Sequence, residues 1–154
     1  MKRLIILFVF SGLSYFGFGQ QEYTWEEYGI SFSLADDFRE KVNTASEFSA
    51  TGDGMELSII PFKDETIDDS DITAFTMGIA ASMKFKRIDD ISVIDFNGFQ
   101  GAYAEGVSDD VKVFIMGLID PDSDTNFFII ITFFDNDENA IDEAVNICTS
   151  IQKL

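Results

Sequence analysis

The chain has 154 residues, of which 28 are acidic and 10 basic, so its formal charge is −18 at pH 7. It contains no histidine and a single cysteine. These counts exclude imidazole-based catalysis and imidazole zinc or copper sites, an intramolecular disulfide, and a four-cysteine zinc or iron–sulfur site within one chain. The charge would also repel nucleic-acid phosphates.

The first 19 residues have the layout of a secretory signal peptide. Lys2 and Arg3 form a basic start, residues 4–10 are continuously apolar, and Gly17 and Gly19 place small residues before a cut at Gln20. An uncleaved anchor is the alternative, but the apolar stretch is shorter than the roughly 20 residues of a spanning helix. We predict a signal peptide at 1–19, one domain at 20–154, no membrane span after cleavage, and a periplasmic or secreted location. Cleavage would leave eight basic and 28 acidic residues, a charge of −20.

The mature N-terminus begins with three aromatic residues, Tyr23, Trp25 and Tyr28. They could form an exposed contact patch, or they could anchor the leading segment onto a sheet. Directly after them, residues 28–38 (YGISFSLADDF) alternate apolar and polar side chains, which predicts a half-buried strand. Residues 47–62 predict a hairpin that turns at Gly52-Asp53-Gly54.

Residues 71–87 have apolar positions at helical spacing, with aspartates before them and basic residues at their end, as the helix dipole favours. Residues 90–106 then predict a hairpin, because Asn97-Gly98 is the preferred pair for a two-residue type I′ turn. Residues 111–119 and 126–134 are the two most apolar strands. The last helix is expected within 137–154, with Asp137 as its cap.

Cys148 belongs to the apolar stripe of this last helix, together with Ile141, Ala144, Val145 and Ile151. A lone cysteine in an exported protein raises the alternative of an intermolecular disulfide. The position on the stripe favours a buried thiol that behaves as a small hydrophobe.

Sequential hairpins predict a central, mainly antiparallel sheet. Strand 126–134 is apolar on both faces, with Phe127, Ile129, Ile131 and Phe133 on one side and Phe128, Ile130 and Phe134 on the other. An antiparallel sheet usually leaves one face in water, so both faces of this strand need cover. We predict an α+β fold, a three-layer α/β/α sandwich with helices on both sides. A homodimer through one face is the alternative.

The order of these elements resembles the PsbP-like group of small α/β/α sandwich domains. The resemblance rests on the YGISFSLADDF strand after an aromatic lead-in, the NGFQGAYAEG hairpin, and an acidic turn into a C-terminal helix ending NICTSIQKL. It covers nearly all of residues 23–154 and rests on the order of the elements and on degenerate sequence patterns rather than on an invariant motif. It implies an accessory or protein-binding role more than catalysis. The photosystem members of the group bind a large complex and assist calcium and chloride retention, but no motif residues carry those sites to this chain.

Asp120, Asp122 and Asp124 alternate between the two most apolar strands and are the candidate metal ligands of this sequence. They fit positions 1, 3 and 5 of an EF-hand loop, but Thr125 replaces the glycine of position 6 and Ile131 the glutamate of position 12. A hairpin loop with Asp120 at position i and Pro121 at i+1 of a turn explains the same residues. A weak calcium site of another design is the alternative.

No residue pattern predicts a catalytic centre, a phosphate-binding loop or a bound cofactor. We therefore predict a non-catalytic, exported accessory domain that binds an envelope or secreted protein. The alternatives are a carrier of a small molecule or lipid, held between sheet and helix, and weak calcium binding.

Overall fold

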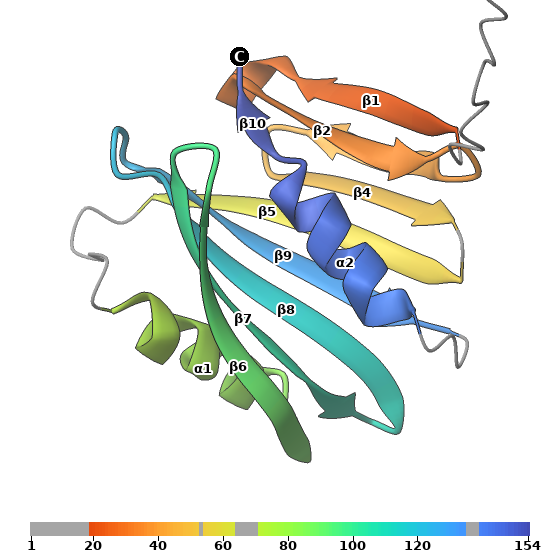
Figure 1. Ribbon diagram of the computed structural model, residues 1–154, viewed down its shortest axis with the longest axis vertical. Helices are drawn as coiled ribbons and strands as arrows, with labels where there is room; N and C mark the ends of the chain where they lie inside the picture. The colour runs from red at the N-terminus through yellow and green to blue at the C-terminus, as the bar shows by residue number, and fades with distance from the viewer. Residues whose placement is uncertain (1–18, 53, 64–70, 135–138) are drawn as a thin grey trace, which may run out of the picture.

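A computed structural model describes residues 19–52, 54–63, 71–134 and 139–154, which form two antiparallel sheets and two α-helices (Figure 1). The expected signal peptide, apart from Gly19, and the expected cap Asp137 lie outside these residues. Within the described ranges, no helix has the length and apolar character to cross a membrane.

The larger sheet has seven strands, and each neighbouring pair is antiparallel. Its order is β3 (Arg39–Thr44), β4 (Glu47–Gly52), β5 (Met55–Lys63), β9 (Thr125–Phe133), β8 (Val111–Ile119), β7 (Phe99–Ser108) and β6 (Arg87–Phe96). The sequence predicts all of these strands except β3. That strand reads REKVNT, lacks apolar alternation and lies at the edge, where pairing with β4 alone holds it.

The smaller sheet consists of β1 (Gln20–Trp25), β2 (Ile30–Ala35) and the two-residue β10 (Gln152–Lys153), with β2 in the centre. A short 3₁₀ turn, η1 (Glu26–Tyr28), joins β1 to β2. Trp25 is 3% exposed and packs against Tyr28, Phe48 and Phe127, so the aromatic lead-in anchors the first strand to the core.

The two helices lie on opposite faces of the seven-stranded sheet, as Figure 1 shows. The helix α2 (Ala140–Thr149) and the smaller sheet cover one face, and α1 (Ile72–Ser82) packs on β7 and β8 from the other. The predicted α+β sandwich is confirmed. The layer that contains α2 also holds a second sheet, which the sequence did not indicate.

Alternation along β8 explains why both layers are needed. Phe114, Met116 and Leu118 belong to the core under α2, whereas Val113, Ile115 and Ile119 pack on the side of α1. All six are at most 4% exposed. Both faces of β8 are therefore covered, whereas Phe128 and Ile130, on the second apolar face predicted for β9, are only partly buried. Phe134, however, follows the end of β9 and is 65% exposed.

The helix α1 ends earlier than the sequence predicts. The chain leaves the helix at Met83, and Lys84 adopts a left-handed backbone with φ of 58°. Phe85 then packs into the core under α1, and Arg87 already belongs to β6. The basic residues expected in the last helical turn thus lie beyond the helix, because burial of Phe85 redirects the chain.

The C-terminal helix confirms the predicted position of the thiol. Cys148 is fully buried, and burial raises the pKa of its thiol far above the ordinary range, so the thiol stays protonated. The helix begins after Asn139 and ends before Ser150. Ser150 Oγ accepts a hydrogen bond of 2.9 Å from Ser33 N–H, which joins the helix end to β2.

Two Gly→Ala substitutions should change stability in opposite directions. A Cβ at Gly106 would overlap Arg87 O and the Phe85 ring, so Gly106→Ala should lower the free energy of unfolding by about 1–3 kcal/mol. Gly78 is exposed within α1, and a Cβ there meets nothing within 4 Å. Gly78→Ala should therefore raise the free energy of unfolding by about 1 kcal/mol through helix propensity. Urea unfolding of both variants tests this; loss of stability in both would contradict the backbone placement of α1.

Candidate functional site

Three segments that are far apart in the sequence meet at one end of the seven-stranded sheet (Figure 1). They are the β6–β7 turn at Asn97-Gly98, the β8–β9 loop at residues 120–124, and β10. Asn97 Nδ2 donates hydrogen bonds to the carbonyl oxygens of Thr149, at 3.0 Å, and of Ile151, at 2.8 Å. The positive φ angles of Asn97 and Gly98, 48° and 81°, are those of the predicted type I′ turn.

Lys153 is the side chain that joins all three segments. Its Nζ donates hydrogen bonds to Asp120 Oδ1, at 2.6 Å, and to Asp122 Oδ2, at 2.9 Å. The same ammonium lies 5.1 Å from the centroid of the Phe99 ring, within the range of a cation–π contact. A Cβ on Gly98 would lie 3.6 Å from Nζ, an ordinary van der Waals contact, so the positive φ of the turn and not lack of space favours glycine there.

The β8–β9 loop has the turn that the sequence predicts. Ser123 N–H donates to Asp120 O at 3.2 Å, which closes a β-turn with Pro121 at its second position. Asp122 N–H and the Ser123 hydroxyl donate to the two carboxylate oxygens of Asp120, at 2.9 and 3.1 Å. Asp120 N–H donates at 3.1 Å to Oδ1 of the buried Asn126.

These contacts determine the charge states of Asp120 and Lys153. Burial by itself raises the pKa of Asp120, but hydrogen bonds from Lys153, Asp122 N–H and Ser123 outweigh it and leave the pKa below the usual range. Burial lowers the pKa of Lys153, and the hydrogen bonds to Asp120 and Asp122 more than compensate, so that pKa is raised. Both groups are therefore charged at neutral pH.

The three aspartates do not point at a common centre. Asp120 and Asp122 share Lys153, whereas Asp124 Oδ2 pairs with Lys63 Nζ at 3.2 Å. Across the described ranges, no group of three or more His, Cys, Asp or Glu side chains is arranged to hold a metal. Calcium would have to displace both lysines to collect these carboxylates, so the weak calcium site stays a prediction.

Two hollows lie beside Lys153. The first, the C-terminal pocket, has a volume of about 420 Å³ and is lined by residues 27–30, Lys63, Asp120, Ser123, Thr125, Phe127 and Lys153. The second, the tip pocket, also has a volume of about 420 Å³ and is lined by residues 95–100 and Pro121. A third, more polar hollow of about 590 Å³ lies near them, between residues 24–27 and 43–45, and shares Glu27 with the C-terminal pocket.

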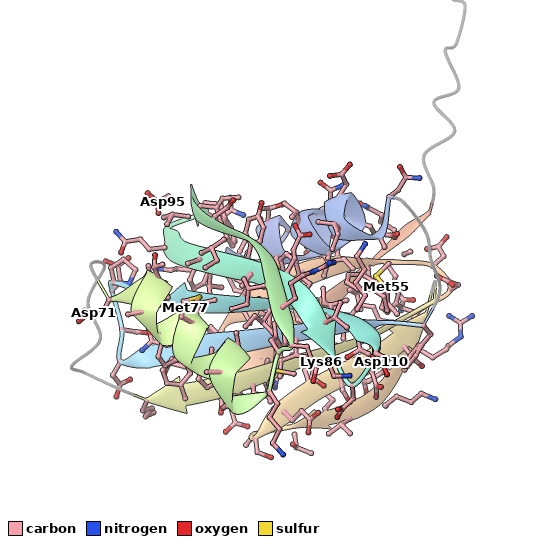
Figure 2. The ribbon with its side chains drawn as sticks, turned by 90° about the horizontal axis from the view of Figure 1, so that it is seen from below. Met55, Asp71, Met77, Lys86, Asp95 and Asp110 are labelled. Atoms are coloured by element: carbon pink, nitrogen blue, oxygen red, sulfur yellow. The ribbon has the colours of Figure 1, made fainter. Side chains whose placement is uncertain are left out.

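The ionic groups at this end are lysines and carboxylates. Lys63 pairs with Asp124 and Lys153 with Asp120, Glu27 and Asp95 also line the hollows, and the chain has no histidine. The only thiol is buried in α2, away from these hollows. A further pair, Lys86 Nζ and Asp110 Oδ1 at 2.8 Å, lies by the β7–β8 turn at the opposite end of the sheet (Figure 2).

Sequence reasoning found Asp120, Asp122 and the Asn97-Gly98 turn but missed Lys153 and Gln100. Lys153 is the second-last residue, and the sequence places it at the end of the expected last helix. No residue pattern there predicts that its side chain contacts two loops. The position of Lys153 follows only from the pairing of β10 with β2, which places Lys153 opposite Ile30.

No protein-family model matches the sequence, and no curated protein matches it. The fold is similar to that of the Saccharomyces cerevisiae Ran-binding protein Mog1p, with a TM-score of 0.62 and 7% identity, over 89% of this chain and 96% of that one. It is also similar to cyanobacterial PsbP from Synechocystis sp. PCC 6803, with a TM-score of 0.60 and 13% identity, over 93% of this chain and 96% of that one. LpqN of Mycobacterium tuberculosis, a protein involved in cell envelope biogenesis, has a similar fold, with a TM-score of 0.54 and 15% identity, over 80% of this chain and 82% of that one. At such identities the similarity shows a shared fold, that of PsbP and Mog1p.

Replacement of Lys153 should reveal the ion pair through its pH dependence. Lys153→Met keeps the aliphatic stem but removes two charge-assisted hydrogen bonds, so we expect a loss of about 1–2 kcal/mol of unfolding free energy at pH 7. The folded pKa of Asp120 is lowered, so the difference from wild type should persist above the ordinary value of 3.8 and disappear as pH falls below it. The folded pKa of Lys153 is raised, so the difference should also disappear as pH rises well beyond 10.5.

Urea unfolding across this pH range measures the effect. Lys41→Met in the exposed strand β3 is the matched control, and its cost should be small at every pH. A Lys153 effect that is independent of pH would mean that packing, and not the ion pair, accounts for it.

Calcium should leave the stability unchanged. Because each of the three loop aspartates already pairs with a lysine, millimolar calcium should shift the melting temperature by less than about 1 °C relative to chelator. Thermal unfolding in both conditions measures this. A rise of several degrees would show that the loop rearranges around the metal and that calcium binding belongs to the function.

Proposed function

We propose that this protein is an exported, non-catalytic accessory domain of the PsbP-like group that acts by binding another protein. The observation that carries the proposal is the end of the sheet described above. Three segments are joined there by Lys153 and Asn97, and hollows open beside them, but the groups present include neither a histidine nor an accessible thiol. An end of the sheet that has hollows between ordered segments suits the binding of a partner protein.

The shared fold supports a binding role. One similar structure is a Ran-binding protein by name, and another is a PsbP protein. Folds host many functions, so this similarity adds only to what the site itself suggests. The site adds a surface made of turns at strand ends, where binding residues are often placed on a rigid scaffold.

Charge narrows the class of partner. An excess of 18 acidic residues repels nucleic acid and anionic lipid and attracts a basic protein surface. The expected signal peptide at 1–19 places the partner in the periplasm or outside the cell. The envelope role of LpqN belongs to that protein, but it is compatible with such a location.

Packing favours a protein partner over a ligand carried inside the domain. Side chains fill the space between the central sheet and α2, including Phe114, Met116 and Ala144, each 0% exposed. The hollows described above lie at strand ends instead. A small molecule or lipid between sheet and helix would therefore have to displace the core.

Site-specific photo-crosslinking tests the proposal. A photo-reactive residue at Pro121, in the β8–β9 loop, should crosslink to one specific partner in an envelope extract of the cells that produce the protein. The same group at Asp109, in the β7–β8 turn at the other end, is the matched control and should not capture that partner. No specific product from Pro121, or equal products from both positions, would contradict binding through this end.

A further inference from the structure

The tip pocket contains a polar atom whose hydrogen-bonding capacity is not used. Gln100 Oε1 is buried, and it accepts no hydrogen bond from any described residue of the chain. A buried acceptor without a donor is unfavourable, and most such atoms in folded proteins are paired. Gln100 lines the tip pocket, so a donor that enters this pocket could satisfy the oxygen once the end of the side chain rotates toward it.

A carboxylate lies next to this amide. Asp95 of β6 is directly opposite Gln100 of β7 in the antiparallel register, so both side chains extend from the same face of the hairpin. Asp95 is exposed and also lines the tip pocket. Figure 2 shows it at the end of β6 farthest from Lys86. Asp95 thus offers the pocket a charged acceptor, and rotation of the Gln100 amide would add a neutral acceptor beside it.

The apolar part of the surroundings suits a long cationic side chain. Phe96 and Phe99 also line this pocket, but they alternate with Asp95 and Gln100 along the strands and pack on the core under α2, so the exposed apolar surface beside the two acceptors comes from β6. Val93, two residues before Asp95 on the same face of β6, is 64% exposed. Methylene groups can lie along Val93 while the charged head reaches Asp95.

We propose that the tip pocket binds an arginine side chain of a basic partner protein. A guanidinium has several donors in one plane and can satisfy a carboxylate and an amide oxygen together. Charge complementarity favours a foreign basic protein over a second copy of this chain, which has 28 acidic and 10 basic residues. The inference rests on the proposed function and names the pocket and the chemistry through which it would operate.

Titration with a small probe tests the pocket independently of any partner. N-acetyl-arginine amide should produce saturable changes in the backbone amide NMR signals of Gly98, Phe99 and Gln100 in the purified protein. N-acetyl-citrulline amide has the same shape without the charge and should bind at least tenfold more weakly. Changes scattered over the acidic surface, or equal changes with citrulline, would overturn the proposal.

Two variants connect the effect to the two acceptors. Asp95→Asn and Gln100→Leu should each weaken arginine binding at least tenfold, whereas Asp142→Asn on the exposed side of α2 should change it less than twofold. Gln100→Leu should also melt at a higher temperature than wild type, because it removes an acceptor without a donor. A lower melting temperature for that variant would contradict the proposal. If the probe fails but Pro121 still crosslinks to a partner, the arginine pocket is wrong and the accessory function stands.

Discussion

Burial of β8 on both faces is the constraint from which the rest of the structure follows. Phe114 and Ile115, successive residues of β8, are both 0% exposed although they face opposite layers. An antiparallel sheet with two apolar faces needs cover on each, which α1 supplies on one side and α2 with the smaller sheet on the other. Polar and charged groups near this strand are consequently confined to its ends, and the candidate site is built there.

At that end, polar contacts replace apolar packing as the source of order. Lys153 belongs to β10, a strand of only two residues. Its ammonium contacts both the Phe99 ring, at the start of β7, and Asp120, in the loop after β8. Asn97 joins the β6–β7 turn to the carbonyl oxygens of Thr149, the last residue of α2, and of Ile151 just after it. Each contact is modest and partly exposed to solvent, but together they hold three segments in one arrangement.

Most of the core is predictable from the sequence, because the alternation of apolar and polar residues in strands and the helical spacing of apolar residues both indicate which side chains are buried. Both central strands, the Asn97-Gly98 turn and the buried Cys148 were identified in this way. It missed β3, whose charged residues lack alternation, and the early end of α1, which depends on Phe85 packing beside Gly106. It also missed Lys153 and the pairing of Asp95 with Gln100, because both depend on strand register rather than on any local pattern.

Lys153 organises the candidate binding end, and hydrogen exchange in a Lys153→Met variant measures this role. Backbone amides at residues 97–99, 120, 122–126 and in β10 should be protected in the wild type. In Lys153→Met they should all exchange faster together, while the amides of β8 and β9 away from this end keep their protection. If only β10 changes, or if no segment changes, the three segments are ordered independently of Lys153, and the account of the site is wrong.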